Sequence, residues 1–231
     1  ADDSCGIDPA SFTLVNETSD NNTCPEVVTR VYQIADLCGN TNTCEQIIDI
    51  NHTIPPTINC PPALTAVCDI SEQPPYANYT AFSTAGGLAV DNCAIDPASF
   101  TLVREVTDSL TCPQTVTRTY LIADLCGNVD SCTQIITVDD NIPPTISCPP
   151  TINTECSIGE IDTLTLANFE LLGGTLSDNC GVDTLRLVSE ISDGNTCPET
   201  ITRTYEVADL CGNIATCQQL IIIDDVTPPT I

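Results

Sequence analysis

The amino-acid sequence predicts an all-β protein made of tandem, disulfide-stapled sandwich repeats. Three observations predict this class. Long segments recur at a fixed spacing, β-branched residues alternate with turn formers while helix signals are nearly absent, and 16 cysteines occur in 231 residues with a single histidine. Short strands separated by frequent turn residues are typical of β-sandwiches.

The cysteines and their flanking motifs repeat with a period of about 88 residues. IDPASFTLV stands at 7–15 and again at 95–103, and ADLCGN stands at 35–40, 123–128 and 208–213. A constant spacing of this kind is the signature of a tandem array. The recurring cysteine sets are Cys5, Cys24, Cys38 and Cys44, then Cys93, Cys112, Cys126 and Cys132, then Cys180, Cys197, Cys211 and Cys217. Two more, Cys60 and Cys68, recur as Cys148 and Cys156.

Paired prolines mark the boundaries between repeats. IPPTI occurs at 54–58 and 142–146, and TPPTI at 227–231. Consecutive prolines stiffen a short connection and interrupt helices and central strands. We therefore expect residues 1–53 to be the C-terminal part of a truncated repeat (the first repeat). Residues 54–141 form a complete second repeat, and 142–231 form a complete third repeat plus the start of the next linker.

The repeat length matches that of an immunoglobulin-like sandwich of about 100 residues. We expect these sandwiches to follow one another head to tail, in a window of a longer polypeptide. In the strand 114–124, Val116, Tyr120 and Ile122 share one face with Arg118, because successive side chains of a strand point to opposite sides. This face hardly varies between repeats, so we expect it to face the core.

The arginine on this predicted core face requires an explanation. A glutamate recurs on the preceding strand, as Glu17, Glu105 and Glu190. Two interpretations stay open: a cross-strand arginine–glutamate pair, or an arginine at the strand end that extends its charged group into water.

The charge excludes several functions. With 5 basic and 32 acidic residues, the formal net charge is -27. Such a surface repels the phosphates of nucleic acids and anionic membranes, and it attracts divalent cations. No apolar run is long enough to cross a bilayer as a transmembrane segment. Dinucleotide-binding, phosphate-loop, zinc-protease and serine-hydrolase motifs are absent. One histidine cannot supply a triad to every repeat, so we expect no enzyme.

The cysteines predict disulfides rather than zinc sites. Paired CxxC motifs, the usual source of four-cysteine zinc sites, do not occur, so an oxidising, extracellular compartment is expected. A strand rises about 3.3 Å per residue, whereas bonded cysteines need Cα atoms about 5–6 Å apart. Hairpin geometry within each repeat then predicts these pairs: Cys5–Cys38, Cys60–Cys132, Cys68–Cys112, Cys93–Cys126, Cys148–Cys217, Cys156–Cys197 and Cys180–Cys211.

A local pairing scheme is the alternative. It joins Cys38–Cys44, Cys5–Cys24 and Cys60–Cys68, and it leaves no cysteine of the first repeat unpaired. An extended strand over 60–68 would hold its two cysteines too far apart. The scheme within each repeat is therefore favoured over the local one.

Aspartates gather where repeats meet. They lie at the end of the last predicted strand of each repeat, on both sides of the DNC motifs and at the start of the ADLCGN turns. Calcium prefers clustered carboxylate and carbonyl oxygens. The hypothesis is a Ca²⁺ ion at each junction, and the alternative is that aspartate only initiates turns. The proposed ligands are Asp49, Asp91, Asp96 and Asp124 at one junction, and Asp139, Asp140, Asp178, Asp183 and Asp209 at the other.

PPTISCPP (143–150), DNC (91–93 and 178–180), ADLCGN and SCTQIITVDD (131–140) together resemble hyalin-repeat (HYR-like) immunoglobulin-like modules. They are most similar to the tandem cysteine-bearing repeats of large secreted surface proteins and adhesins of Bacteroidota. The resemblance covers the whole chain and implies export and an adhesive or fibre-forming role. It also supports the pairs Cys60–Cys132 and Cys148–Cys217, and it implies O-glycans on Ser109, Thr163 and Thr184.

The function expected from the sequence is therefore structural. The chain is interpreted as a segment of a long extracellular repeat fibre or cell-surface adhesin. Its partners would be further repeats of the same polypeptide, identical chains in a filament, and a surface or glycan target. The alternative is a glycan- or matrix-binding accessory module of a larger secreted protein, which the low aromatic content of 4% disfavours.

Overall fold

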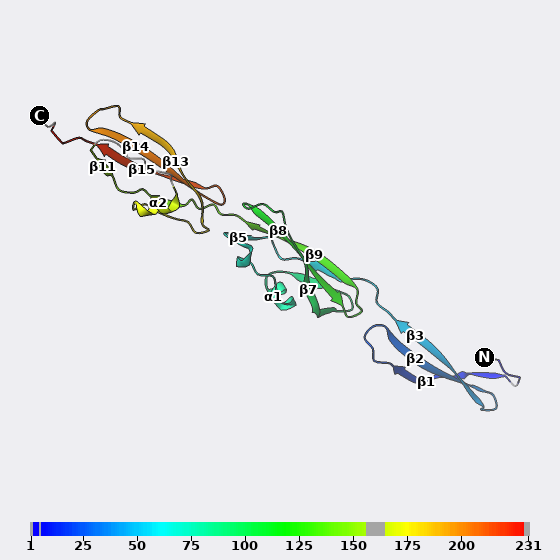
Figure 1. The fold of residues 1–231 in the computed structure, drawn as a ribbon. Coiled ribbons are helices and arrows are strands. Elements are labelled where there is room, and N and C mark those ends of the chain that lie inside the picture. Colours follow the sequence, from blue (N-terminus) through cyan, green and yellow to red (C-terminus); the bar gives the residue numbers. More distant parts are fainter. Residues whose placement is uncertain (1, 5, 156–164, 229–231) are drawn as a thin grey trace. The chain divides into compact units, whose positions relative to one another are not determined.

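The computed structural model describes residues 2–4, 6–155 and 165–228 (Figure 1). The chain divides into two compact units, each described by itself. The first unit contains residues 1–62, 75–105 and 118–134. The second contains residues 63–74, 106–117 and 135–231. The strands between residues 95 and 138 contribute to both units.

Three long antiparallel strands recur in each repeat, as the alternating sequence predicts. Strand order within each trio follows the chain, so each is a simple meander. The strands are β1 (Ile7–Ser19), β2 (Glu26–Asp36) and β3 (Thr41–Ile50); β7 (Ile95–Thr107), β8 (Gln114–Asp124) and β9 (Val129–Val138); and β13 (Val182–Ser192), β14 (Glu199–Asp209) and β15 (Ile214–Ile223).

Short elements precede the second and third trios. They are β4 (Thr57–Asn59), β5 (Leu64–Ala66), the 3-10 turn η1 (Ile70–Glu72), α1 (Tyr79–Thr84) and β6 (Leu88–Val90), then β10 (Thr145–Ser147), β11 (Ile152–Thr154), α2 (Leu166–Leu171) and β12 (Thr175–Ser177). β4 pairs with β6, whereas β5 runs parallel to the end of β9. β10–β12 and β11–β15 repeat this pattern. The first segment of each complete repeat thus contributes one short strand to the two-stranded sheet and the next to the four-stranded sheet.

The fold is an all-β, disulfide-stapled, immunoglobulin-like sandwich, as predicted. In the first unit a two-stranded sheet and α1 pack on the inward faces of β7 and β8. Phe82 of α1 is fully buried and its ring centroid lies 4.8 Å from that of Phe100. Burial of each such side chain contributes about 1.5–3 kcal/mol to stability. The buried cluster is Ile58, Phe82, Ala89, Phe100, Tyr120 and Ile122.

A glycine after each helix makes room for the central phenylalanine. A Cβ atom on Gly87 would lie 2.3 Å from Cε1 of Phe82, and one on Gly174 would lie 2.3 Å from Cε1 of Phe169. Both glycines follow a second glycine with positive φ, which ends the helix at its C-terminus. The paired glycines therefore fix how closely helix and sheet approach.

The predicted inward face of the second strand is confirmed in the second and third repeats. Val116, Arg118, Tyr120 and Ile122 are all buried on β8, and β14 shows the same alternation. On β2 every residue is only partly buried, because no second sheet packs on β1–β3 among the described residues.

The arginine on this face forms the cross-strand pair. Nε of Arg118 donates to Oε2 of Glu105 at 2.5 Å, and the Arg118 side chain is 3% exposed. The same bond joins Arg30 to Glu17 and Arg203 to Glu190. The interpretation of an arginine extended into water is therefore wrong for the second and third repeats.

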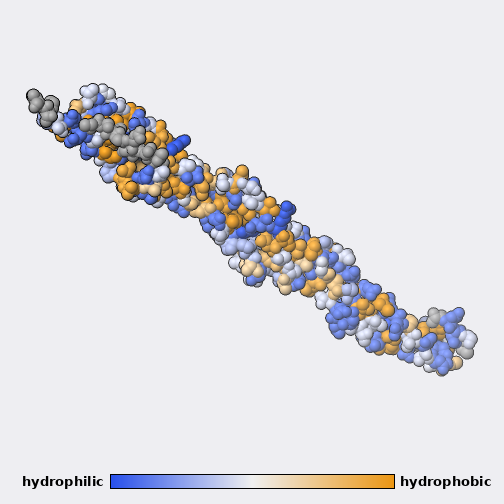
Figure 2. All heavy atoms as spheres, viewed as in Figure 1, coloured by the Kyte–Doolittle hydropathy of each residue, from blue (hydrophilic) through white to orange (hydrophobic). Residues whose placement is uncertain are grey.

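Hydrophobic and hydrophilic residues are interspersed over the face shown in Figure 2. In the described part of the chain, no helix has the length and apolar character that crossing a membrane requires.

Candidate functional site

The candidate sites are the two places where a linker meets the ADLCGN loop of the following repeat. The first joint, defined as Cys24, His52, Asp91, Asp124, Cys126 and Asn128, lies within the first unit. Cys24 of the first repeat is bonded to Cys126 of the second, with Cα atoms 5.0 Å apart. Nδ2 of Asn128 donates to the backbone oxygen of His52 at 3.0 Å.

His52 lies between two buried carboxylates in this joint. Its Nε2 atom is 3.4 Å from Oδ1 of Asp91 and 3.5 Å from Oδ2 of Asp124. The side chains of Asp91 and Asp124 are 1% and 0% exposed, and that of His52 is 11% exposed. A protonated imidazole here would partly balance the two negative charges.

Hydrogen bonds from backbone amides, and at Asp124 also from the Asn128 side chain, lower the pKa of both carboxyl groups. Oδ1 of Asp91 accepts from the amides of Cys93 and Ala94, and mainly the Cys93 bond lowers the pKa of Asp91. Burial opposes ionisation of Asp124, but hydrogen bonds from the side chain and backbone of Asn128 and from the Cys126 amide outweigh it, so the pKa of Asp124 is lowered.

The second joint, defined as Cys68, Cys112, Asp140, Asp178, Asn179, Cys180, Asp209, Cys211 and Asn213, lies within the second unit. Two disulfides cross it: Cys112–Cys211, with Cα atoms 4.9 Å apart, and Cys68–Cys180, with Cα atoms 5.0 Å apart. Nδ2 of Asn213 donates to the backbone oxygen of Asp140 at 2.8 Å. This repeats the Asn128–His52 contact.

Asp140 occupies the place of His52 in the second joint. It is 2% exposed, and its Oδ2 accepts from Nδ2 of Asn179 at 3.1 Å. A carboxylate oxygen of Asp178 lies within 4.8 Å of one of Asp140, and Oδ2 of Asp178 is buried without a hydrogen-bond partner. The second joint therefore contains two neighbouring carboxylates where the first has a carboxylate and an imidazole.

The structure brings together some of the predicted calcium ligands. Asp91 and Asp124 converge on His52, and Asp140 converges with Asp178. The others do not join these groups among the described contacts. Asp49 and Asp183 are exposed on β3 and β13, Asp96 accepts from the amide of Ala98, Asp139 lies against Sγ of Cys112, and Asp209 accepts from Asn213.

Sequence reasoning missed His52 as a joint residue, because histidine occurs only once. The available signal was its position, since residue 52 corresponds to Asp140 in the period of 88. Each of these two residues lies at the end of one repeat and contacts the ADLCGN loop of the next repeat.

The disulfides correct the predicted connectivity. The pairs Cys60–Cys132 and Cys148–Cys217 are present. The pairs Cys68–Cys112, Cys93–Cys126 and Cys180–Cys211 are wrong, because Cys68, Cys112 and Cys126 each bond to a neighbouring repeat. Cys38, Cys44, Cys93 and Cys197 are free and exposed. This also contradicts the local pair Cys38–Cys44 and the predicted partnerships of Cys38 and Cys197, whose expected partners Cys5 and Cys156 lie outside the described residues.

The expected glycosylation positions are partly described. Ser109 lies at the tip of the β7–β8 turn with a φ of 65°, and Thr184 is exposed on β13. Thr163 lies outside the described residues. O-glycosylation of these positions stays a prediction.

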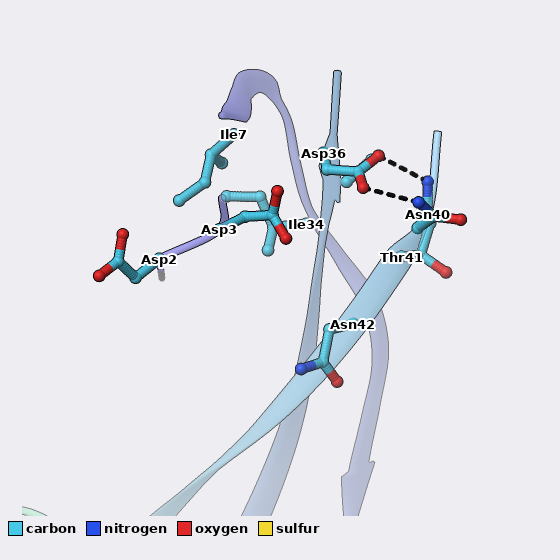
Figure 3. Close-up of a pocket in the computed structure, with 9 residues that line it drawn as sticks. Asp2, Asp3, Ile7, Ile34, Asp36, Asn40, Thr41 and Asn42 are labelled. Atoms are coloured by element: carbon cyan, nitrogen blue, oxygen red, sulfur yellow. Dashed lines mark hydrogen bonds between the residues drawn. The ribbon is translucent and has the colours of Figure 1, made fainter. Parts of the chain in front are cut away.

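A pocket opens beside the ADLCGN loop of the first repeat (Figure 3). Its lining includes Asp3, Ile34, Asp36, Asn40 and Asn42. The carboxylate of Asp36 accepts from the backbone and side-chain nitrogens of Asn40. This loop has the geometry of the corresponding loops in the two joints.

No protein-family model and no curated protein matches the chain. Among solved structures it is similar to ectodomain repeats 3–6 of protocadherin gammaB7, at 12% identity and a TM-score of 0.31, over 95% of this chain and 65% of that one. It is also similar to domains 1–5 of protocadherin gamma B2, at 9% identity and 0.32, over 94% and 53%. A third is the human desmocollin-1 ectodomain, at 11% identity and 0.25, over 93% and 54%. The chain thus spans less than two thirds of each of these structures.

Proposed function

We propose that this chain is a structural segment of an extracellular repeat fibre or cell-surface adhesin in which consecutive repeats are covalently joined. One observation carries the proposal: three disulfides connect cysteines that belong to neighbouring repeats. They are Cys24–Cys126, Cys68–Cys180 and Cys112–Cys211. A module that works alone has no need of bonds to the module beside it, whereas a load-bearing array does.

The energetics support this role. A disulfide that closes a loop of about 100 residues stabilises the folded state by up to about 4.7 kcal/mol in the chain-entropy model. Cys112 and Cys211 are separated by 99 residues, so their bond is in this class. Because such bonds persist only in oxidising environments, an extracellular location follows from the same feature.

Calcium binding at the second joint is part of this proposal. In its favour, Asp140 and Asp178 bring two carboxylates together, and the buried Oδ2 of Asp178 lacks a hydrogen-bond partner. Calcium takes carboxylate oxygens at about 2.3–2.6 Å. The first joint offers His52 in the place of Asp140, so we assign calcium to the second joint only.

The aromatic residues of the second repeat do not favour the glycan-binding alternative, whereas Phe12 and Tyr32 of the first repeat stack beside an open pocket. Tyr76, Tyr79 and Phe82 pack against Phe100 and Tyr120 in the core, rather than lining a concave surface. Stacking platforms for sugars require accessible aromatic faces.

The proposed function is tested on the native source material. Antibodies against residues 54–141 are applied to intact cells and to material shed from them, and the label is located by electron microscopy. We expect label on the outer surface along filaments with regular beads. Label confined to the cell interior, or isolated globular particles outside the cell, would contradict the proposal. Permeabilised cells serve as the control for antibody access.

A further inference from the structure

The first joint contains a buried group of three side chains with the chemistry of a metal site. Nε2 of His52 lies 3.4 Å from Oδ1 of Asp91 and 3.5 Å from Oδ2 of Asp124. The side chains of the two aspartates are 1% and 0% exposed, and that of His52 is 11% exposed. All three residues lie within one unit, in a joint whose two sides are both present in the chain.

The ring nitrogen of His52 that faces the carboxylates is not satisfied by them. Nε2 is buried and makes no hydrogen bond of normal geometry within the described part of the chain. Its distances to the two carboxylate oxygens exceed the about 2.7–3.2 Å of an ordinary N–H···O bond. A buried polar atom without a partner is costly, so an ion held between the imidazole and the carboxylates would remove this cost.

The distances from Nε2 suit a tetrahedral metal ion. Zinc binds an imidazole nitrogen at about 2.0–2.1 Å and a carboxylate oxygen at about 2.0–2.2 Å. At the tetrahedral angle these bonds hold neighbouring ligand atoms about 3.3–3.5 Å apart, which matches both distances from Nε2 of His52. Calcium prefers about six to eight oxygen ligands, so the imidazole favours a transition metal over calcium.

Electrostatics favour a divalent cation over a proton at this place. The hydrogen bonds that lower the pKa of Asp91 and, against the effect of burial, that of Asp124 leave both carboxylates negative at neutral pH. Protonation of His52 would cancel one of these buried charges, whereas a divalent ion bound to the neutral imidazole cancels both. Because an unpaired buried charge is costly, the divalent ion is the better counter-charge.

The residues around this group hold its ligand atoms in place. Oδ1 of Asp91 accepts from the Cys93 amide at 2.7 Å. Oδ2 of Asp124 accepts from Nδ2 of Asn128 at 2.8 Å. The same Nδ2 atom donates to the backbone oxygen of His52 at 3.0 Å. Outer hydrogen bonds of this kind orient metal ligands, and here they fix the linker residue against the loop of the next repeat.

We propose that His52, Asp91 and Asp124 form a binding site for a divalent transition metal of the zinc type, which links the end of the first repeat to the second repeat. Water would take the remaining position of a tetrahedral ion. Sγ of Cys93 also lies within 4.8 Å of ligand atoms of His52 and Asp91. Its counterpart Cys180 is disulfide-bonded in the second joint, so we do not count the Cys93 thiol as a ligand.

One residue position distinguishes the two joints in the kind of ion that each would bind. Asp140 supplies a carboxylate in the second joint where His52 supplies an imidazole in the first. Imidazole suits zinc and its neighbours among the transition metals, whereas carboxylate oxygens suit calcium. The zinc site stands whether or not calcium binds the second joint, and whether or not the chain is adhesive.

Zinc binding is measured on the oxidised chain carrying Cys93→Ser, after its remaining thiols have been blocked with iodoacetamide. This treatment removes thiols as zinc ligands. Equilibrium dialysis in millimolar Mg²⁺, which occupies weak carboxylate sites, should retain about one zinc ion per chain. Calorimetry should give a higher Tm with Zn²⁺ than with EDTA, because the ion binds only the folded joint.

Two variants in this background make the result specific. His52→Gln should weaken zinc binding by more than about 100-fold and abolish the rise in Tm, since loss of even a partner outside the ligand set costs about 10–100-fold. Asp49→Asn, which changes an exposed aspartate on β3, should alter neither. Peptide mapping of Cys24–Cys126 confirms that the joint has formed in each variant. Equal zinc binding by His52→Gln and the parent chain would overturn the proposal.

NMR of the chain without any substitution gives a second readout, because His52 is its only histidine. Zinc should shift the imidazole signals of this residue, whereas Ca²⁺ at the same concentration should not. Imidazole signals that stay in place with zinc, or that move equally with calcium, would overturn the zinc site even where the variant fails to fold.

Discussion

Cys112 of the second repeat is bonded to Cys211 of the third, and the backbone oxygen of the linker residue Asp140 accepts from Asn213 in the same loop. The ADLCGN loops of the second and third repeats thus each bind the end of the preceding repeat. In each loop the aspartate shapes the turn, the cysteine makes the covalent bond and the asparagine holds the arriving backbone.

Removal of this bond should loosen the second unit. The double substitution Cys112→Ala with Cys211→Ala is expected to reduce the free energy of unfolding by about 2–5 kcal/mol, because the unfolded chain regains the entropy of a long loop. Denaturant unfolding of the oxidised protein measures this effect. Cys44→Ala removes a free, exposed thiol and should leave the midpoint unchanged. Equal midpoints for the double variant and Cys44→Ala would contradict a stabilising bond.

The arginine–glutamate pairs should differ in value between repeats. Glu105→Gln leaves the buried guanidinium of Arg118 without this carboxylate, so we expect a loss of about 1–3 kcal/mol. Glu17→Gln affects Arg30, whose side chain is 40% exposed, and should cost less than Glu105→Gln because water screens the exposed pair. Thermal unfolding of the two variants compares them directly, and a larger loss for Glu17→Gln would refute the burial argument.

Acid should weaken the ADLCGN loops. Burial opposes the ionisation of Asp209, but hydrogen bonds from Asn213 and the Cys211 amide prevail and lower its pKa below the usual 3.8. The stabilisation is therefore complete above pH 3.8 and is lost as the pH falls through the lowered pKa of the folded state. Asp209→Asn should reduce stability at neutral pH and flatten the acid limb of a plot of Tm against pH. An unchanged acid limb would show that this carboxylate contributes nothing to acid sensitivity.

Calcium should act on the second joint and not on the first. We expect millimolar Ca²⁺ to raise the Tm of the protein, because an ion between Asp140 and Asp178 would relieve their repulsion. Asp140→His copies the arrangement at His52 and should abolish the shift, while His52→Asp should enlarge it. The shift is measured by calorimetry with Ca²⁺ against EGTA, with Mg²⁺ as the control ion. No shift in the unmodified chain would remove calcium from the account.

Much of the fold could be predicted from the sequence, because it is governed by local rules. Alternation placed Tyr120 and Ile122 on the buried face of β8, and the recurring glutamate was one of the two interpretations left open for Arg118. The first segment of each complete repeat pairs with one sheet and then with the other, and no local sequence signal predicts this change. β5 is three residues long, and its parallel pairing with β9 depends on how the chain passes the core.

The joints could be predicted only in part. Aspartates were correctly expected there, yet hairpin geometry was applied within single repeats, so Cys126 was given the wrong partner. The cysteine at the turn between the first two long strands lies at the opposite end of the hairpin from the ADLCGN loop of its own repeat, so it cannot reach that loop. The linker leaves the repeat at the same end as this cysteine, which can therefore reach the ADLCGN loop of the next repeat. The cysteines recur with a regular period. A pair bonded between consecutive repeats is therefore separated by about one period more than the equivalent pair within a repeat. Both pairing schemes fit the same cysteine positions, so spacing alone does not distinguish them.

The central claim is that disulfides join neighbouring repeats, and non-reducing peptide mapping of the oxidised chain tests it most directly. Proteolysis followed by mass spectrometry should recover linked peptides that contain Cys24 with Cys126, Cys68 with Cys180, and Cys112 with Cys211, all of which vanish after reduction. Recovery of Cys68 linked to Cys112 and of Cys180 linked to Cys211 would contradict the account, because the repeats would then be stapled only within themselves.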